Sequence, residues 1–408
     1  PIVQTWFTPD PAPLVVGDRL YVYTGHDEPG ADFFWMNEWR VYSTTDMANW
    51  TDHGTPLSLA SFSCADDRSW ASQCIERNGK FYWYICAHSK LSGGMAIGVA
   101  VGDSPTGPFR DAIGKPLFEN GSWDHIDPTV LIDEDGQAWL YWGNPHIYYL
   151  KLNEDMISLA EEPRPIEHGP WWSDAPFLWK RKGVYYLLTH RAWYSTADNV
   201  YGPYTYRGKF CHDCNNVDHP CVFEYHNQTY FAYGVPANYG RGETDPYYRA
   251  TKIIYAHYKD NGDICIDEFI QDVGVGQYDT SWPAIKGEWY FAASDGVYKK
   301  ENADGFEMRG IQDGSYLYYQ NVNNMRQNAK MFIRGICGQK PCQIEVREGS
   351  PYGPVLGCCR VAPDGEGVRE YAIPLSNTFG THSLCFVFRG EGEDLFTFDD
   401  FRFEQPKP

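Results

Sequence analysis

The sequence contains no run of eighteen apolar residues, and it is poor in positive charge. Lys and Arg together number 34 against 54 Asp and Glu, which gives a formal net charge of −20. The first absence predicts that nothing spans a membrane. The second argues against nucleic acid and anionic membrane surfaces as partners, because both are bound through patches of Lys and Arg. A Met and a signal peptide are also missing before Pro1, and we expect that a leader was removed by processing or by cloning.

The chain is long and rich in aromatic residues. Its 408 residues are too many for one ordinary domain and suit two. Aromatic residues make up 16 % of the chain, with 15 Trp and 30 Tyr. Large aromatic side chains dominate the burial in protein cores, and their flat faces also fit the apolar faces of sugar rings. The composition therefore favours core packing for most of these residues and leaves room for a carbohydrate site.

The twelve cysteines leave two interpretations open. Cys211-His212-Asp213-Cys214 resembles half of a zinc site, but no second pair of ligands lies nearby in the sequence. Local disulfides or free buried thiols are favoured over zinc. Cys64 with Cys74, and Cys337 with Cys342, are also close in sequence.

An aromatic-rich strand pattern recurs five times, each copy preceded by turn residues. The copies are RLYVYTG (19–25), KFYWYIC (80–86), QAWLYWG (137–143), VYYLLTH (184–190) and QTYFAYG (228–234). Their spacing of roughly 45 to 60 residues is the span of a four-stranded propeller blade. We therefore predict an all-β fold with a five-bladed β-propeller over residues 1–282. The alternative is an array of β-sandwiches whose strands are similar by accident.

The sequence pattern changes near residue 283, where short segments of alternating polar and apolar residues replace the aromatic-rich strands. Expected strands cover residues 317–322, 329–336, 343–348, 383–389 and 395–403. This pattern predicts a β-sandwich over residues 283–408.

Three acidic residues precede predicted blades, each beside Pro or a small residue. They are Asp10, Asp127 and Asp174, before the first, third and fourth aromatic strands. An Asp before Pro is commonly a turn residue. Because equivalent blade positions converge on the propeller axis, however, the repetition predicts a trio of carboxylates across one funnel. Such a trio suits glycoside hydrolysis, in which one carboxylate activates water, one acid protonates the leaving oxygen, and a third raises the pKa of the acid.

Several motifs together resemble glycoside hydrolase family 43 over nearly all of residues 1–282. They are Thr-Pro-Asp-Pro-Ala-Pro-Leu-Val (8–15), the stretches 41–54, 70–82 and 104–109, Ile-Asp-Pro-Thr-Val (126–130) and Asp-His-Pro (218–220). The resemblance implies a five-bladed propeller and an inverting mechanism that needs no cofactor for catalysis. It also implies that Asp10 is the general base and that Asp127 tunes and orients the acid.

The sequence departs from the family pattern at the acid itself. The family has Glu-Gly-Pro or Glu-Ala-Pro, whereas this chain has Asp174-Ala175-Pro176. The shorter side chain withdraws the carboxylate by about an ångström, and such a misplacement can cost about a hundredfold in rate. Three hypotheses remain: Asp174 is the acid with a compensating backbone shift, Glu167 takes its place, or the protein binds carbohydrate without cutting it.

The resemblance extends to five further residues of a sugar-binding funnel. His219 matches a histidine near the propeller axis, where many relatives order a central calcium or water cluster, and Arg249 matches an arginine that reaches toward the sugar. Trp70, Phe33 and Trp35 are expected to form walls of the sugar subsite. For His219 the alternative is a core histidine whose hydrogen bonds are satisfied. For Arg249 it is a structural ion pair, and for the three aromatic residues it is packing in the core.

Residues 283–406 resemble a family 6 carbohydrate-binding module. The markers include Asp313 to Tyr319, Gly349 to Gly357 and Leu395 to Asp399. In that family a structural calcium is held by acids of the first and last strands, and Glu288 and Asp399 fall at such positions. The alternative is that both are surface acids. Asp400 and Phe401 stand where the family has paired aromatics, so the module is also compatible with a bracing role.

These observations combine into one functional expectation. We expect a secreted, monomeric exo-glycosidase that removes terminal α-L-arabinofuranose from a plant cell-wall polysaccharide, arabinoxylan. The stretches Tyr23 to Glu28 and Met36 to Arg40 resemble the arabinofuranosidase and xylosidase branch. A β-xylosidase is the alternative within the same class, and a carbohydrate-binding protein without catalysis is the alternative from another class.

Overall fold

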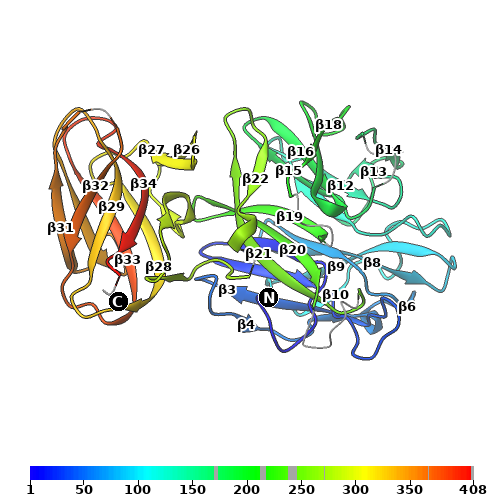
Figure 1. Ribbon diagram of the computed structural model, residues 1–408. Helices are drawn as coiled ribbons and strands as arrows, with labels where there is room; N and C mark the ends of the chain where they lie inside the picture. Colours follow the sequence, from blue (N-terminus) through cyan, green and yellow to red (C-terminus); the bar gives the residue numbers. More distant parts are fainter. Residues whose placement is uncertain (170–172, 212–216, 238–245, 271, 366, 406–408) are drawn as a thin grey trace. The chain divides into compact units, whose positions relative to one another are not determined.

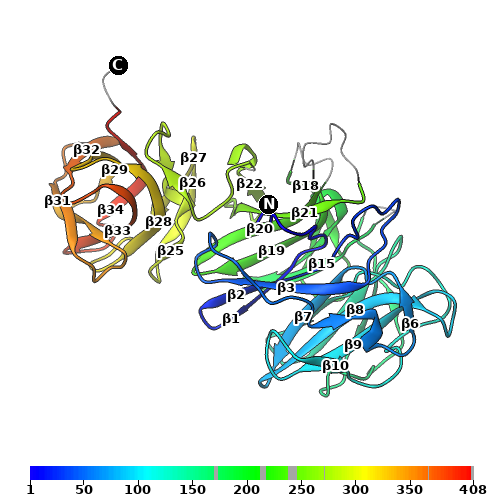
Figure 2. The same cartoon turned by 90° about the horizontal axis from the view of Figure 1, so that it is seen from below.

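A computed structural model describes residues 1–169, 173–211, 217–237, 246–270, 272–365 and 367–405 (Figures 1 and 2). Packing divides the chain into two units. One holds residues 1–45, 49–223 and 231–254, and the other holds residues 46–48, 224–230 and 255–408. Within the described ranges, no helix has the length and apolarity that a bilayer crossing requires.

Five antiparallel sheets follow one another along the first two thirds of the chain (Figure 1). The first has β1 (Ala12–Val16), β2 (Arg19–Thr24), β3 (Glu38–Thr44), β4 (Thr51–Asp52) and β5 (Leu57–Ser58). The second has β6 (Ala65–Asp67), β7 (Ser72–Arg77), β8 (Lys80–Ser89), β9 (Met95–Gly102) and β10 (Phe109–Asp111). The third has β11 (Thr129–Ile132), β12 (Ala138–Trp142), β13 (Tyr148–Lys151) and β14 (Arg164–Pro165). The fourth has β15 (Phe177–Arg181), β16 (Val184–Thr189), β17 (Trp193–Ala197) and β18 (Thr205–Lys209). The fifth has β19 (Asp218–Tyr225), β20 (Gln228–Pro236), β21 (Arg249–Tyr258) and β22 (Ile264–Ile266).

The five aromatic patterns in the sequence form β2, β8, β12, β16 and β20, one in each sheet, so these predicted strands are confirmed. Their aromatic content follows from burial on both faces. Along β12, Leu140 and Trp142 pack with the second sheet, while Trp139 and Tyr141 pack with the fourth. Successive side chains of a strand point to opposite faces, and each blade lies between two others, so neither face can be polar.

The starts of five strands meet at one place. A small cavity of about 30 Å³ is lined by the first residues of β1, β7, β11 and β15 and by residues near the start of β19. This convergence is the axis of the five-bladed propeller that the strand spacing predicts.

Four of these strand starts share an unusual backbone turn. Asp10, Asp127, Ala175 and His219 each have a positive φ, between 42° and 60°, and each stands directly before a proline. The left-handed region is uncommon for residues other than glycine, and such residues cluster at functional sites. In blades one, three and five the left-handed residue itself carries a polar side chain. In blade four it is Ala175, and the acid Asp174 lies one residue earlier.

Two further sheets form the C-terminal β-sandwich, most visible in Figure 2. One contains β23 (Tyr278–Asp279), β25 (Ala292–Ala293), β28 (Tyr316–Met325), β30 (Cys342–Glu348), β31 (Val355–Val361) and β33 (Gly380–Gly390). The other contains β24 (Ile285–Lys286), β26 (Tyr298–Asn302), β27 (Gly305–Arg309), β29 (Lys330–Cys337), β32 (Arg369–Pro374) and β34 (Phe396–Phe403). Among the residues that the structure describes, helical structure is limited to 3₁₀ turns at η1 (Leu59–Ser61), η2 (His190–Ala192), η3 (Glu268–Ile270) and η4 (Gly287–Trp289).

All five strands expected in the sandwich are present, as β28, β29, β30, β33 and β34. The shorter β23 to β27, and the more exposed β31 and β32, were not predicted. Since β23 already pairs with β28, sandwich pairing begins before residue 283. The predicted division between residues 282 and 283 stays a prediction.

The cysteines of two pairs that lie close together in the sequence are free thiols and do not form local disulfides. Cys64, Cys74, Cys337 and Cys342 are all free. Cys211 is disulfide-bonded, and the remainder of the half zinc motif, residues 212–214, lies outside the described residues.

The sandwich core gives a stability prediction. Phe398 is fully buried and packs against Phe386 and Phe401, with ring centroids 5.3 and 6.3 Å away. Truncating a buried Phe to Ala loses its transfer free energy and leaves a cavity. We therefore expect Phe398→Ala to lower the free energy of unfolding by about 3–5 kcal/mol, measured by denaturant titration. Phe379→Ala is the matched control: this ring is 76 % exposed, and a change above about 0.5 kcal/mol there would contradict the packing account.

Candidate active site

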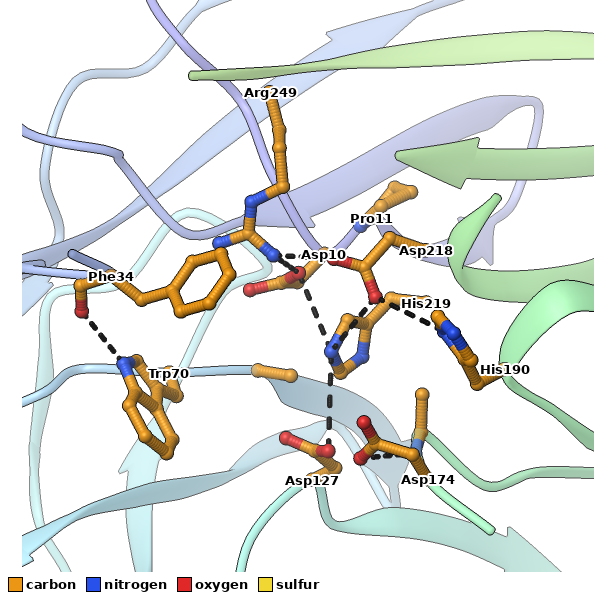
Figure 3. A network of polar contacts seen from close by, with 12 residues as sticks. Asp10, Pro11, Phe34, Trp70, Asp127, Asp174, His190, Asp218, His219 and Arg249 are labelled. Atoms are coloured by element: carbon orange, nitrogen blue, oxygen red, sulfur yellow. Dashed lines mark hydrogen bonds and ion pairs between the residues drawn. The ribbon is translucent and has the colours of Figure 1, made fainter. Parts of the chain in front are cut away.

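A cavity of about 490 Å³ opens over the converging strand starts, and carboxylates line it. Asp10, Asp127 and Asp174 all contribute to its wall, from the starts of blades one, three and four. Figure 3 shows the three carboxylates grouped around His219. The structure therefore brings together the acids that the sequence repetition singled out.

Arg249, the first residue of β21, is the buried cation of the site. Its Nε and Nη2 donate to the two oxygens of Asp27, at 3.1 and 2.9 Å. Its Nη1 donates to Asp10 Oδ1 at 2.8 Å and to Asp218 Oδ2 at 2.7 Å. Phe34 covers the guanidinium, with its ring centroid 4.8 Å from Cζ. The structural ion pair proposed for this arginine is present, and Arg249 also lines the cavity.

His219 lies at the centre of four acids. Its Nε2 is 3.5 Å from Asp10 Oδ1, 3.7 Å from Asp218 Oδ1 and 3.9 Å from Asp127 Oδ2 (Figure 3). Burial lowers the pKa of the imidazole, but the surrounding carboxylates, Asp10 first, outweigh burial and raise it to about 9. His219 is therefore a cation at neutral pH.

Burial and charge oppose each other at Asp10. Its side chain is almost completely buried, and burial raises the pKa of the carboxyl, while Arg249 and His219 lower it. The balance raises the pKa of Asp10 from 3.8 to about 6. Asp10 is thus ionised at neutral pH and accepts a proton just below it, which is the range suited to a general base.

Asp127 and Asp174 form a second, different environment across the cavity. Burial raises the pKa of Asp127 well above its usual value, and the charge of Asp174 and a hydrogen bond with it raise the pKa further. A carboxyl group in such surroundings keeps its proton to a higher pH than an isolated Asp does. Asp174 Oδ1 also accepts from the backbone N–H of Ala175 at 2.9 Å, which fixes the orientation of the carboxyl.

The aromatic residues expected at the sugar subsite divide into two groups. Trp70 and Phe33 line the cavity, and Trp70 Nε1 donates to the carbonyl of Phe34 at 2.8 Å. Trp35 lies outside the lining, 39 % exposed. Glu167, the alternative acid, is exposed and lies outside the lining as well.

Sequence reasoning missed four residues of the described site. Asp27 and Asp218 complete the ring of carboxylates around Arg249, and His190 Nδ1 is 3.7 Å from Asp218 Oδ1. Phe34 covers the guanidinium. Asp218 stands beside His219 in the Asp-His-Pro motif, which was a usable signal. Asp27 and Phe34 belong to the loop between β2 and β3 and carry no pattern of their own.

The first half of the chain matches a known family. Residues 1–207 match glycosyl hydrolases family 43. The chain belongs to this family. It is therefore a glycoside hydrolase, and family 43 enzymes are inverting glycosidases. Residues 287–405 match the carbohydrate binding module of family 6.

Curated proteins of related activity are similar to nearly all or to about half of this family 43 chain. An arabinoxylan arabinofuranohydrolase of Bacillus subtilis is 28 % identical, over 99 % of this chain and 92 % of its own length. A xylosidase/arabinosidase of Bacteroides ovatus is 32 % identical, over 49 % of this chain and 76 % of its own length.

Solved structures agree with the fold along the whole chain. A Bacillus subtilis arabinoxylan arabinofuranohydrolase in complex with cellotetraose is 25 % identical, with a TM-score of 0.59 over 100 % of this chain and 97 % of that one. A β-xylosidase/α-arabinofuranosidase from a compost metagenome, in a calcium-free form with xylotriose, is 27 % identical, with a TM-score of 0.59 over 65 % of this chain and 95 % of that one. The all-β prediction of a five-bladed propeller and a sandwich is confirmed.

The two calcium positions expected from family resemblance can be tested against the side chains present. Glu288 is buried, its Oε2 has no partner, and burial raises its pKa to about 8. Asp399, however, pairs with Arg334 Nη2 at 2.5 Å. Neither residue belongs to a cluster of three or more potential ligands among the described residues. This set does not fit the oxygen cage that Ca²⁺ prefers.

The propeller axis gives the same result. Asp10, Asp218 and His219 are close enough to hold a metal ion. The Arg249 guanidinium already donates to both carboxylates. The positive charge that a metal would supply is therefore already provided, and these residues do not fit calcium.

The Arg249 cluster predicts a pH-dependent loss of stability. Arg249→Met removes the guanidinium from two buried carboxylates, Asp10 and Asp27, and from the partly buried Asp218, which should cost about 3–5 kcal/mol at neutral pH. Arg249 lowers the pKa of Asp10 and of Asp218, so its contribution is present while they are ionised and is lost as they protonate. In thermal unfolding, the gap between native enzyme and variant should be largest above pH 6 and shrink as the pH falls.

Arg402→Met is the matched control for this measurement. Arg402 pairs with Glu370 at 2.7 Å, and both side chains are more than a third exposed, so we expect a cost below about 1 kcal/mol. An Arg249→Met variant as stable as Arg402→Met would contradict the buried-cluster account.

Proposed function

We propose that this family 43 enzyme is an inverting exo-glycosidase that removes terminal α-L-arabinofuranose from arabinoxylan. The observation that carries the proposal is the division of the acids by environment. Asp10 is paired with two cations, whereas on the opposite wall burial and the charge of Asp174 raise the pKa of Asp127 well above its usual value. Carboxyl groups whose environments push their pKa values apart are the pattern of an acid and base pair.

Asp10 acts as the general base in this proposal. At neutral pH it is ionised, and it takes a proton from the water that attacks the anomeric carbon. As the proton arrives, the carboxylate loses its charge while Arg249 keeps its contacts with Asp27 and Asp218. The ring of charges therefore stays paired through the step, so the base needs no large rearrangement.

Asp174 acts as the general acid. Of the two carboxyl groups on this wall it is the less buried, so it is the one that meets the glycosidic oxygen. As the proton leaves, negative charge appears on the pair, and the cationic His219 lies 3.9 Å from Asp127 to stabilise it. Asp127 thus lies beside the acid, and His219 compensates the negative charge that the step leaves on this wall.

The substrate assignment rests on relatives that match over nearly the whole chain. The Bacillus subtilis protein and one from Paenibacillus polymyxa are arabinoxylan arabinofuranohydrolases, and each matches 99 % of this chain. Relatives named xylosidase/arabinosidase keep β-xylosidase as a second candidate. The family 6 match supports a carbohydrate-binding role for the sandwich. Because a polysaccharide does not enter a cell intact, we also propose that the enzyme is secreted.

Hydrolysis of nitrophenyl α-L-arabinofuranoside and nitrophenyl β-D-xylopyranoside tests the assignment. We expect the arabinofuranoside to be cleaved faster, and Asp10→Asn to lower kcat by at least about a hundredfold because the general base is lost. An unchanged thermal transition would show that the variant is folded. Absence of hydrolysis of both substrates, in the native enzyme and in Asp174→Glu alike, would instead support a binding protein without catalysis.

The pH profile tests the role of Asp10 separately. Because its pKa is raised to about 6, kcat/KM should fall about tenfold for each pH unit below that value. The charge of Asp218 contributes to raising this pKa, so Asp218→Asn should move the acid limb of the profile to lower pH. Asp135→Asn, at an exposed turn, should leave the limb in place. An acid limb that does not respond to Asp218→Asn would remove Asp10 from the base role.

A further inference from the structure

Three of the exposed large aromatic side chains of the propeller unit come from two loops beside the active-site cavity. Phe33 and Trp35, in the loop between β2 and β3, are 37 % and 39 % exposed, and Trp123, in the loop between β10 and β11, is 47 % exposed. Burying indole and phenyl rings is favourable, so a group of them left in solvent on one protein marks an interaction site.

Arg68 joins these rings into one surface. Its guanidinium carbon lies 4.7 Å from the Trp35 ring, 5.0 Å from the Trp123 ring and 6.0 Å from the Phe33 ring. Arg68 comes from the short link between β6 and β7 and forms an ion pair with Asp67. We call Phe33, Trp35, Arg68 and Trp123 the aromatic shelf.

The shelf is held in place at both ends. Trp35 Nε1 donates to Asp32 Oδ1 at 3.2 Å. The Trp123 ring lies 5.3 Å from the ring of His88, whose Nδ1 is 2.7 Å from Asp66 Oδ1. Preorganised rings lose little entropy when a ligand stacks on them.

One end of the shelf joins the active-site cavity. Phe33 lines the cavity, and its ring lies 6.4 Å from Trp70 and 5.6 Å from Trp35. Trp35, Arg68 and Trp123 lie outside the cavity lining. A ligand whose end occupies the cavity would therefore continue over these three residues.

We propose that the aromatic shelf binds the main chain of the polysaccharide, on the leaving-group side of the bond that is cut. Neutral xylose rings would stack on the two indoles, and Arg68 and Asp66 would bond to their hydroxyls. The shelf carries one arginine beside two aspartates, Asp66 and Asp67, so it favours an uncharged sugar chain over one that bears acidic substituents. This inference rests on the proposed function, because it needs a sugar in the cavity.

Comparison of a polymer with a small substrate tests the shelf. For Trp123→Ala, we expect the loss of kcat/KM on arabinoxylan to exceed the loss on nitrophenyl arabinofuranoside by about threefold to tenfold, the value of one lost aromatic stack. Trp123→Phe should recover most of the difference. Equal losses on both substrates, or none on either, would overturn the proposal.

Trp6→Ala is the matched control. Trp6 is 40 % exposed and lies under an arginine, Arg40, at 4.3 Å, as Trp123 lies under Arg68, but it belongs neither to the cavity lining nor to the shelf. We expect Trp6→Ala to alter the two substrates equally. A selective loss on arabinoxylan in this control as well would mean that exposed tryptophans act without regard to position.

A binding measurement separates failure of the shelf from failure of the proposed function. Unbranched xylotetraose is titrated into the full-length Asp10→Asn protein, with and without Trp123→Ala, by calorimetry. Weaker binding in the Trp123→Ala protein supports the shelf, even if no arabinofuranoside is hydrolysed by the native enzyme. Identical binding with and without Trp123 overturns the shelf and leaves the arabinofuranosidase proposal standing.

Discussion

The Arg249 guanidinium holds together the part of the propeller where its blades meet. Its donors reach Asp27 and Asp10 in the first blade region and Asp218 in the fifth. The first and last blades of a propeller are far apart in sequence, and this cluster joins residues 222 positions apart. A single buried cation thus helps to close the ring and sets the charge of the Asp10 carboxylate. The closure of the propeller ring and the charge of the Asp10 carboxylate therefore depend on the same ion pairs of Arg249.

Much of this architecture is predictable from sequence because it is built from local signals repeated in order. Each central strand, such as β8 or β12, needs apolar side chains on both faces, and this makes its aromatic pattern visible. Asp10 and Asp127 were found because the same turn before a proline recurs at equivalent blade positions. The recurrence of this turn distinguishes these two aspartates from ordinary turn residues, which a single Asp before a proline would resemble.

Features that depend on long-range packing were not predictable in the same way. Asp27 gives no local sign that it will bind a cation 222 positions away, and nothing near Arg68 in the sequence indicates that it will stack on Trp123. The calcium expected at Glu288 and Asp399 does not suit the side chains that surround them, for a similar reason. Arg334, on another strand, supplies the positive charge to Asp399, and only the pairing of β29 with β34 brings it there.

The turn before β15 gives the fourth blade a freedom that the other blades lack. At Asp10, Asp127 and His219 the residue with the left-handed backbone also carries the functional side chain, so replacing it changes turn and chemistry together. In blade four Ala175 adopts that backbone, and Asp174 is only its neighbour. The side chain at position 174 can therefore be exchanged between Asp and Glu during evolution while the turn, and with it the fold, stays the same.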